Sequence, residues 1–498
     1  MLVRDPALPL SCLSTEIDQM LLQLEERVIR DNEGIVGPFT AFEACDYTSA
    51  LVRIATGHTD DSDSIATDSI SLFDPASPTP SSLSLYIDAV AAELMHNYIH
   101  IVSHVLQPAD HPKNPYRSIY VPRAIAAGRI VVGIGDNQSH SGTALSHALL
   151  AVSAFHMYRN QPENQHYDKL ARLHRVEAVS SLKNALSVGE GTSDRSTTLS
   201  AMLSLVSIDL MEGEFTEFWI HLEGCERLMS SFGGPPDNSP QHTQLNNICS
   251  FMHTLSQSTA PYTTPKPSLE ACDRIEDLLN HSPFLPDDHS LEFTYGTTAN
   301  LASYLHLTIS LSQSIAYFEL NELPTPPYLR KACMALYAAI SGWSINQESL
   351  ASLPGTDYET RSLITCHVVA FHAAIVIYFH TMLDYPTPHS ILQSYNKICV
   401  SNLLAAEVLK MSNGASKGWN AMAPIVWPGF VASCEAELID QPLWRAWWTG
   451  VQKYCIGSIK TLWDVVQDVW RDRDAGLAQK PGWREVLRRR GKRVMSGG

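Results

Sequence analysis

Apolar residues recur at every third or fourth position from about residue 85 to residue 490. This spacing places them on one side of an α-helix, so it predicts helices. No alternating stretch of comparable strength occurs, and the one candidate for an extended segment is RIVVGIGDNQ, from Arg129 to Gln138. We therefore predict an all-α fold, a large multi-helix array. The predicted helices cover residues 85–106, 144–158, 167–187, 197–211, 214–231, 244–256, 269–280, 297–320, 327–343, 357–383, 389–411, 421–437, 442–471 and 482–490.

The first 84 residues have a different texture. After one short candidate helix, 14–31, comes HTDDSDSIATDSISLFDPASPTPSSLS, residues 58–84, which is rich in Ser, Thr, Asp and Pro. Such a segment cannot bury enough apolar surface to offset its chain entropy. We expect a largely disordered N-terminal segment and linker over 1–84, an all-helical domain over 85–480, and a basic helix end and tail over 481–498.

Charge is unevenly spread along the chain. The formal net charge is −17, and residues 481–498 contain six Lys and Arg against one Glu, a net of +5. The preceding residues therefore carry −17 − 5 = −22. Because phosphate binding requires clustered Lys and Arg, we do not expect the helical body to be a nucleic-acid surface. The basic tail is a separate feature.

Cysteines and apolar runs bear on the compartment. Ten cysteines are scattered singly, mostly within apolar helical segments, a pattern typical of reduced thiols in the core of an intracellular protein. The N-terminus has no sustained apolar run, so we expect no signal peptide. The most apolar run, VVAFHAAIVIYF over 368–379, is too short to span a bilayer and is expected to be a buried helix. No membrane association is expected.

Motifs for cofactor binding and nucleophilic catalysis are weak or missing. GIGDNQ after IVV resembles the start of a dinucleotide-binding loop, but Gln138 replaces its third glycine and no alternation of strands and helices follows. We interpret it as a loop. The sequence contains no G-x-S-x-G, paired Cys and His signature or P-loop. No catalytic, cofactor-binding or metal-binding residue is assigned, and there is no positive case for an enzyme.

Histidines recur in two predicted helices. They are His96, His100 and His104 in one helix and His367, His372 and His380 in another. Histidines one turn apart can bind zinc, but zinc enzymes need further ligands and usually the glutamate base of H-E-x-x-H. Asn97 stands where that glutamate would be. We expect buried histidines with hydrogen-bond partners.

The segment GEFTEFWIHLEGCERLMSSFGGPP, from Gly213 to Pro236, is either the wall of an active site or a packing element. Its spacing favours packing, because six residues form one apolar stripe. They are Phe215, Phe218, Trp219, Leu222, Cys225 and Met229.

Polar positions of the same segment support the packing interpretation. Glu223 and Arg227 form an outward pair one turn apart, and His221 follows Glu217 by one turn, within reach of a hydrogen bond. Gly224 costs about 1 kcal/mol against Ala in a helix interior, so we expect it to let another helix approach closely. The glycines and prolines at 233–236 are expected to end the helix.

Within this helix, WIHLEGCERLM follows the pattern W-x-H-L-x-G-[small]-x-R-L-[apolar]. The pattern resembles a hallmark of the fungal-specific transcription factor domain, the middle region of zinc binuclear cluster regulators. We call Trp219, His221, Leu222 and Gly224 the signature residues. N-P-Y-R at Asn114 and Pro115 resembles a loop of the branch similar to the arginine-metabolism regulator. Further resemblances are ALSHALLAVSAFHMYR at 144–159, YDKLARLHRVEAVSSLKNAL at 167–186, IVWPGFVASCEA at 425–436 and WREVL at 483–487.

The resemblance implies a nuclear, all-helical regulatory domain that switches metabolic genes, often those of biosynthetic clusters. The family's DNA reader is a module of six cysteines that holds two zinc ions, whereas only Cys12 and Cys45 precede residue 200 here. We therefore do not expect direct sequence-specific DNA binding by these residues. Three explanations stay open: a missing first exon, a relative that lost the module and works through a partner, or a domain with another use.

Two function hypotheses follow. The first is a transcriptional regulator or co-regulator of metabolic genes without its own zinc cluster, which acts through protein partners that include a DNA-binding zinc cluster regulator. The alternative is an enzyme or small-molecule-binding protein of a biosynthetic pathway that uses a pocket among the helices. The tail cations are a nuclear localisation signal, a weak phosphate-contacting patch or a solvated helix end. They are Arg488, Arg489, Arg490, Lys492 and Arg493.

Overall fold

The described part of the chain is entirely helical in its regular structure, which confirms the predicted all-α array. The computed structural model describes residues 89–131, 139–188, 194–215, 217–230, 239–262, 265, 284, 289–385, 388–418, 421–476 and 482–495. The predictions for 1–84, for a helix over 269–280 and for the stop at 233–236 lie outside these residues.

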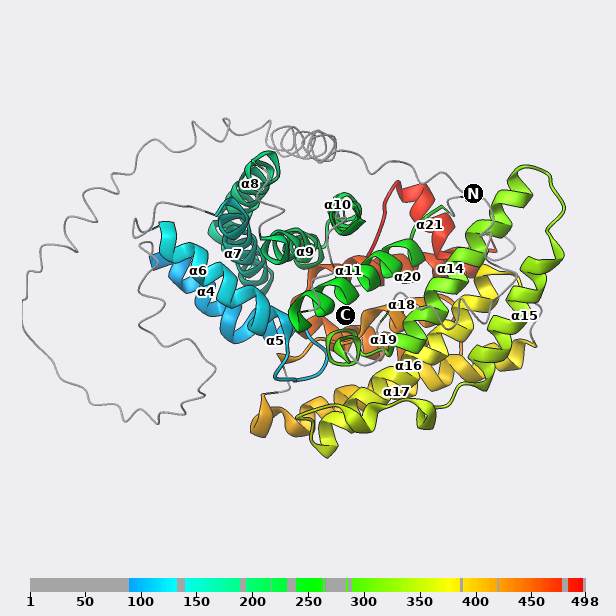
Figure 1. The fold of residues 1–498 in the computed structure, drawn as a ribbon. Helices are drawn as coiled ribbons and strands as arrows, with labels where there is room; N and C mark the ends of the chain where they lie inside the picture. Colours follow the sequence, from blue (N-terminus) through cyan, green and yellow to red (C-terminus); the bar gives the residue numbers. More distant parts are fainter. Residues whose placement is uncertain are drawn as a thin grey trace, which may run out of the picture.

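Two groups of helices flank a central one (Figure 1). The first group is α4 (Ala89–Asn97), α5 (Ser103–Val105), α6 (Val121–Val131), α7 (His140–Asn160), α8 (Gln165–Ser187) and α9 (Arg195–Glu212). The second is α14 (Ala299–Leu320), α15 (Pro327–Gly342), α16 (Tyr358–Met382) and α17 (His389–Lys417). Between them lie α10 (Phe218–Ser230), α11 (Pro240–Ser258), α13 (Ser290–Tyr295), α18 (Val426–Cys434), α19 (Gln441–Val451), α20 (Gly457–Asp474) and α21 (Trp483–Arg490).

Local sequence signals fix where several helices begin and end. The side chains of Ser139, Asp194 and Ser239 each accept a hydrogen bond from a backbone N–H in the first turn of the helix that follows. These N-caps satisfy donors that have no partner inside the helix. At the other end, α9 stops at Gly213 and α17 at Gly418, both with left-handed backbone. Glycine adopts that conformation without a steric penalty.

The two most enclosed helices are α9 and α16. Every residue of α9 from Thr197 to Glu212 is buried. The long helix α16 is apolar enough and long enough to cross a membrane by composition, but 78% of its apolar window is buried inside the body. It is longer than the run 368–379 on which the sequence interpretation rested. The prediction that this run is a buried helix is confirmed.

Two local predictions were wrong, and a third was incomplete. The extended segment at 129–138 begins inside α6, which runs to Val131, and 132–138 lie outside the described residues. The helix predicted over 85–106 is present from Ala89 to Val105, but a π-helical stretch, Tyr98–Val102, joins α4 to α5. The helix predicted over 442–471 is two helices, because a 3₁₀ turn (Gln452–Tyr454) and Cys455 with φ of 54° separate α19 from α20.

Short helical pieces also escaped the periodicity argument. A second π-helix, Tyr116–Tyr120, leads into α6, and two 3₁₀ turns, Ile345–Gln347 and Leu350–Ser352, lie between α15 and α16. The six-residue α13 was not predicted either. These pieces are shorter than the window over which a helical period can be recognised.

Candidate functional site

Helix α10 carries the signature residues and packs against α9 and α11. Leu222 and His221 are buried, whereas Trp219 is half-buried. A Cβ added at Gly224 would stand 2.6 Å from Cε of Met202 on α9, so this glycine leaves room for the end of that side chain. The predicted Glu223–Arg227 pair is present, with Arg227 Nη2 2.8 Å from Glu223 Oε1.

Glu217 does not bind His221, contrary to the sequence interpretation. Its carboxylate lies 2.5 Å from Nη2 of Arg175, a buried arginine of α8. The same guanidinium donates to Asp209 at 2.9 Å and to Glu212 at 2.8 Å. Arg175 thus joins α8 to the end of α9 and to the residue before α10. We call Arg175, Asp209, Glu212 and Glu217 the arginine cluster.

Burial sets the protonation of the groups in and around this cluster. It raises the pKa of Asp209 to about 7, although the charge of Arg175 acts in the opposite direction. Burial also raises the pKa of Glu212, again against Arg175. For His221, burial and the nearby positive charge of Arg175 lower the pKa to about 3, so the ring is neutral at physiological pH. Carboxyl groups with perturbed pKa values can mark an active site, but here both Asp209 and Glu212 are paired with the buried Arg175.

A close backbone contact lies beside the arginine cluster. Gly213, with φ of 81°, ends α9, and a Cβ there would stand 2.5 Å from the backbone of Gly457 on α20. A Cβ on Gly457 would in turn overlap the carbonyl of Glu212. Thr461 Oγ1 donates to the carbonyl oxygen of Gly213 at 2.8 Å. The arginine cluster therefore stands where α8, α9, α10 and α20 meet.

Asn114 and Pro115 organise the loop before α6. Asn114 is buried, its Nδ2 donates to the carbonyl of Ser103 at 3.0 Å, and its Oδ1 accepts from the backbone N–H of Tyr116 at 2.9 Å. Pro115 is buried and stands at the start of the second π-helix. On α11, Gln244 Nε2 donates to the carbonyl of Lys113. These contacts hold the loop and expose no reactive group.

The basic tail is docked on the body. Arg489 pairs with Asp472 and Arg490 pairs with Asp468, both on α20. Arg488 pairs with Glu485 of its own helix. Lys492 and Arg493 are exposed, and the guanidinium of Arg493 lies 4.6 Å from the ring centroid of Trp219. One signature residue therefore contacts the tail directly.

The last described residues anchor this tail. Val494 and Met495 are buried, and Thr259 Oγ1, just after α11, donates to the carbonyl of Val494 at 2.7 Å. Arg484 Nε donates to the carbonyl of Ala260 at 3.0 Å, and its Nη2 lies 3.3 Å from the hydroxyl of Tyr378 on α16. Residues 482–495 thus bind α10, α11, α16 and α20 together.

The prediction of buried histidines was wrong for His96 and His100, which are exposed, whereas His104 is half-buried with its Nε2 3.4 Å from Nη1 of Arg117. In α16 the predicted hydrogen-bond partners are only partly present. His372 Nε2 lies 2.8 Å from the carbonyl oxygen of Ile340, and His380 Nδ1 lies 3.4 Å from that of Tyr385. His367, by contrast, is buried with no hydrogen-bond partner on either ring nitrogen. Among the residues that the structure describes, no three His, Cys, Asp or Glu side chains are grouped so as to hold a metal ion.

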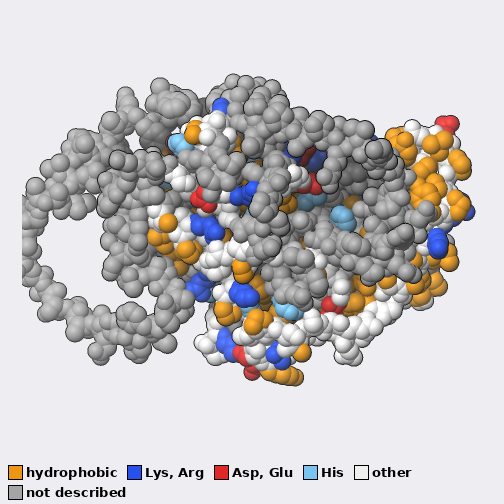
Figure 2. Space-filling view, viewed as in Figure 1, with side chains coloured by type: hydrophobic (Ala, Val, Ile, Leu, Met, Phe, Trp, Pro, Cys, Tyr) orange, Lys and Arg blue, Asp and Glu red, His pale blue; other side chains and the backbone are white. Residues whose placement is uncertain are grey.

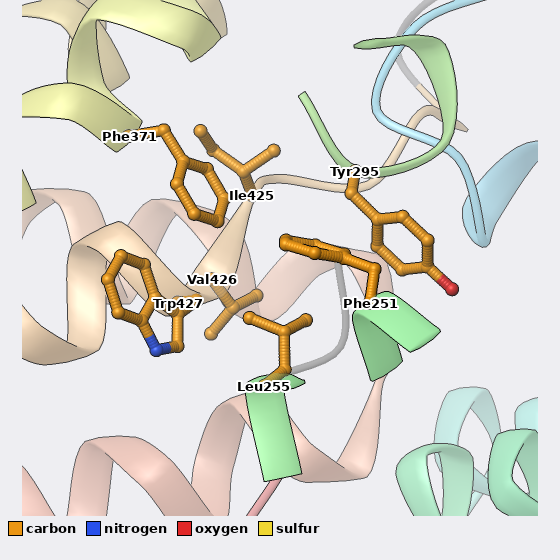
Figure 3. A pocket seen from close by; sticks show the side chains of 7 residues that line it. All are labelled: Phe251, Leu255, Tyr295, Phe371, Ile425, Val426 and Trp427. Carbon is orange, nitrogen blue, oxygen red and sulfur yellow. The ribbon is translucent and has the colours of Figure 1, made fainter. Parts of the chain in front are cut away.

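A small void lies among α11, α13, α16 and α18 (Figure 3). The side chains around it leave no room for a water molecule. Its lining residues come from α11, α13, α16 and the start of α18. They are Phe251, Leu255, Tyr295, Phe371, Ile425, Val426 and Trp427. The hydroxyl of Tyr295 points away from the other side chains, and Trp427 Nε1 donates to Ser258 at 2.8 Å. This void presents only apolar side chains.

The outer surface of the helices shows two apolar areas. One covers the tip of the α14–α15 hairpin, where Leu320, Leu323 and Met334 are exposed; Figure 2 shows hydrophobic side chains gathered at this edge. The other follows α17 and the segment between α18 and α19. Exposed apolar areas of this kind mark protein interaction sites.

The sequence interpretation missed the arginine cluster, although a signal was present. Asp209 interrupts the apolar run SLVSIDLM of the most buried helix, and Arg175 lies on the apolar side of α8 between Ala171 and Ala178. Charged side chains are almost never fully buried unless they are paired. Two opposite charges on buried faces of neighbouring helices therefore predict a pair.

Comparison with known proteins is consistent with this architecture. The family model described as the fungal specific transcription factor domain matches residues 93–497. Arginine metabolism regulation protein II of Saccharomyces cerevisiae is 22% identical over 479 residues, covering 78% of this chain and 54% of that protein. The chain thus spans about half the length of that relative. No solved structure matches. With the family model covering most of its length, the chain belongs to the fungal-specific transcription factor domain family.

Proposed function

We propose that this chain is a nuclear transcriptional regulator of metabolic genes that acts through protein partners. The observation that carries the proposal is the family match over 93–497. The packing of the signature residues supports it, because Leu222, His221 and Gly224 build the interior of the helical body. The similarity to arginine metabolism regulation protein II supports the proposal that the target genes are metabolic.

A DNA-binding partner completes the proposal. The helical body is acidic, with Arg489 and Arg490 of the tail neutralised by aspartates of α20. An acidic surface repels the phosphates of DNA. We therefore assign sequence-specific DNA binding to a zinc cluster regulator that recruits this chain to its promoters.

Transcript profiling after gene deletion tests regulation. We expect the messages of one metabolic pathway to change together, and restoring the full chain should return them to their starting levels. Chromatin immunoprecipitation of the tagged chain should find it at the promoters of those genes, and this occupancy should vanish when the partner regulator is deleted. Unchanged messages with accumulation of a single pathway intermediate would sink the regulator proposal and favour the enzyme.

Nuclear entry is assigned to the exposed cations of the tail. Lys492 and Arg493 are exposed, whereas Arg489 and Arg490 are engaged with α20. Replacing Lys492 and Arg493 by Ala should remove nuclear accumulation of a fluorescent fusion. Arg471, whose side chain is 71% exposed, is the control: Arg471→Ala should leave the fusion nuclear. Equal nuclear signal from both variants would contradict this assignment.

A further inference from the structure

The outward face of α17 has an unusual composition for an exposed helix surface. Seven of its exposed residues recur alternately at four and three positions along 22 residues, the spacing of a coiled-coil seam. These seven are small or apolar, and the exposed Lys397 lies beside them. They are Ser394, Ile398, Ser401, Ala405, Val408, Ser412 and Ala415. Each of the seven is exposed to solvent in the part of the chain that the structure describes.

Large apolar side chains flank the seam at both ends. Met411 and Val408 are 60% and 58% exposed toward its C-terminal end. Near its N-terminal end lie Leu438 and Ile439, which are 72% and 78% exposed, together with Leu443. The segment before α19 is fixed beside α17, because Glu437 lies 2.7 Å from His389, and Trp444 Nε1 donates to Asn396 at 2.8 Å.

We propose that the seam of α17 is a homodimer interface in which two copies of this chain pair their α17 helices antiparallel about a two-fold axis near Ala405. Such an axis brings Ile398 of one copy toward Met411 of the other. It also places Leu438 and Ile439 of one copy beside Val408 and Met411 of the second. Each apolar flank thus finds its counterpart at the other end of the same surface, as a two-fold interface requires.

Charge at the seam is also self-complementary. In the proposed antiparallel pair, Lys397 lies opposite residue 413 of the other copy, about one turn from Lys417. Lys417 there binds both Asp357 and Glu359, so two carboxylates share one ammonium group. Lys397 is exposed and makes no ion pair with another described residue. It can pair with one of these two carboxylates in the partner copy, which favours the antiparallel arrangement over a parallel one.

The available area fits a dimer only when the flanks take part. A helix of 29 residues is about 43 Å long and about 10 Å wide, so the α17 face alone offers on the order of 400 Å² per copy. Stable interfaces bury at least about 600 Å² per partner. The segment from Leu438 to Leu443 supplies the remainder. We therefore expect a dimer of moderate affinity, with Kd in roughly the micromolar range.

Sedimentation equilibrium of the full chain measures the association. We expect dimers at tens of micromolar and dissociation on dilution. Met411→Glu should raise Kd at least about tenfold, since it puts two like charges into an apolar interface. Met334→Glu on α15 is the matched control, because Met334 is 63% exposed on a different face and its replacement should leave Kd unchanged. Circular dichroism of both variants should match the parent chain.

Cross-linking tests the two-fold axis itself. In Ala405→Cys the two new thiols lie near the axis, so a short bis-maleimide should link two copies, beyond any background from the native cysteines of the parent chain. Ala338→Cys, at an exposed position of α15, should give no added product. The proposal is wrong if the chain stays monomeric at every concentration up to its solubility limit. It is equally wrong if Met411→Glu leaves a dimer intact or if Ala405→Cys gives no linked product.

Discussion

The neutral state of His221 makes a sharp prediction about pH. This signature residue is buried, and its pKa is about 3 in the folded chain against an ordinary value of 6.5. Its folded pKa is therefore depressed, so its contribution to stability is fully present above pH 6.5. That contribution is lost as pH falls from 6.5 toward 3, because the unfolded chain takes up a proton that the folded chain excludes.

The magnitude follows from the same two values. A pH of 5 lies about 1.5 units below the ordinary pKa of 6.5, so the ring is protonated in the unfolded chain but still neutral in the folded chain. At 1.36 kcal/mol per unit, the wild type should lose about 2 kcal/mol of its unfolding free energy between pH 7.5 and pH 5 through this residue. His221→Gln keeps a polar side chain of similar size but has no proton to gain, so it should lack this loss.

Urea unfolding at several pH values measures the effect. The quantity of interest is the difference in unfolding free energy between wild type and His221→Gln, which should fall by about 2 kcal/mol from pH 7.5 to pH 5. Asp209 also titrates, and it is present in both proteins. Its raised pKa of about 7 gives stability that is fully present below about pH 3.8 and is lost as pH rises through 7. Its effect therefore cancels in the difference. His166→Gln, at an exposed position, is the control. A difference that does not change with pH would refute the neutral buried state of His221.

Three further predictions concern packing. Arg175→Met should destabilise the chain by about 3–5 kcal/mol in urea unfolding, because buried Asp209 and Glu217 lose their cationic partner and Glu212 keeps only Arg172. Arg172→Met, at a half-exposed position, should cost under about 1 kcal/mol. Gly457→Ala should lower the melting temperature because its Cβ overlaps the carbonyl of Glu212, while Gly450→Ala, with open space around it, should raise it slightly; equal effects would contradict the close contact. Met495→Asp should cost at least about 2 kcal/mol by burying an unpaired carboxyl group, and an unchanged urea midpoint would show that the tail is not docked.

How far the sequence could predict this molecule depends on the range of each interaction. The long helices follow from apolar spacing within each segment, and the Glu223–Arg227 pair follows from one helical turn. The arginine cluster does not, because Arg175 lies 34 to 42 residues from its carboxylate partners on other elements. Glu217 illustrates the limit.

Two partners compete for the Glu217 carboxylate. His221 is one turn away in the sequence, but the structure pairs Glu217 with the charged guanidinium of Arg175. A charged donor forms a stronger hydrogen bond than a neutral imidazole does. The break at Cys455 likewise depends on where α20 must begin to meet α9, and helix spacing within 442–471 contains no information about that meeting.

The docking of the C-terminal segment also sets the order in which the chain can finish folding. Thr259 meets the carbonyl of Val494 across 235 residues of sequence. At roughly 5–20 residues per second, a ribosome needs about 10 to 50 s to synthesise that stretch. During this time the apolar surface of α10 and α11 that Val494 and Met495 later cover stays exposed. The nascent helices therefore depend on chaperones or on partial collapse until release, and slower translation of the second half would lengthen their exposure to aggregation.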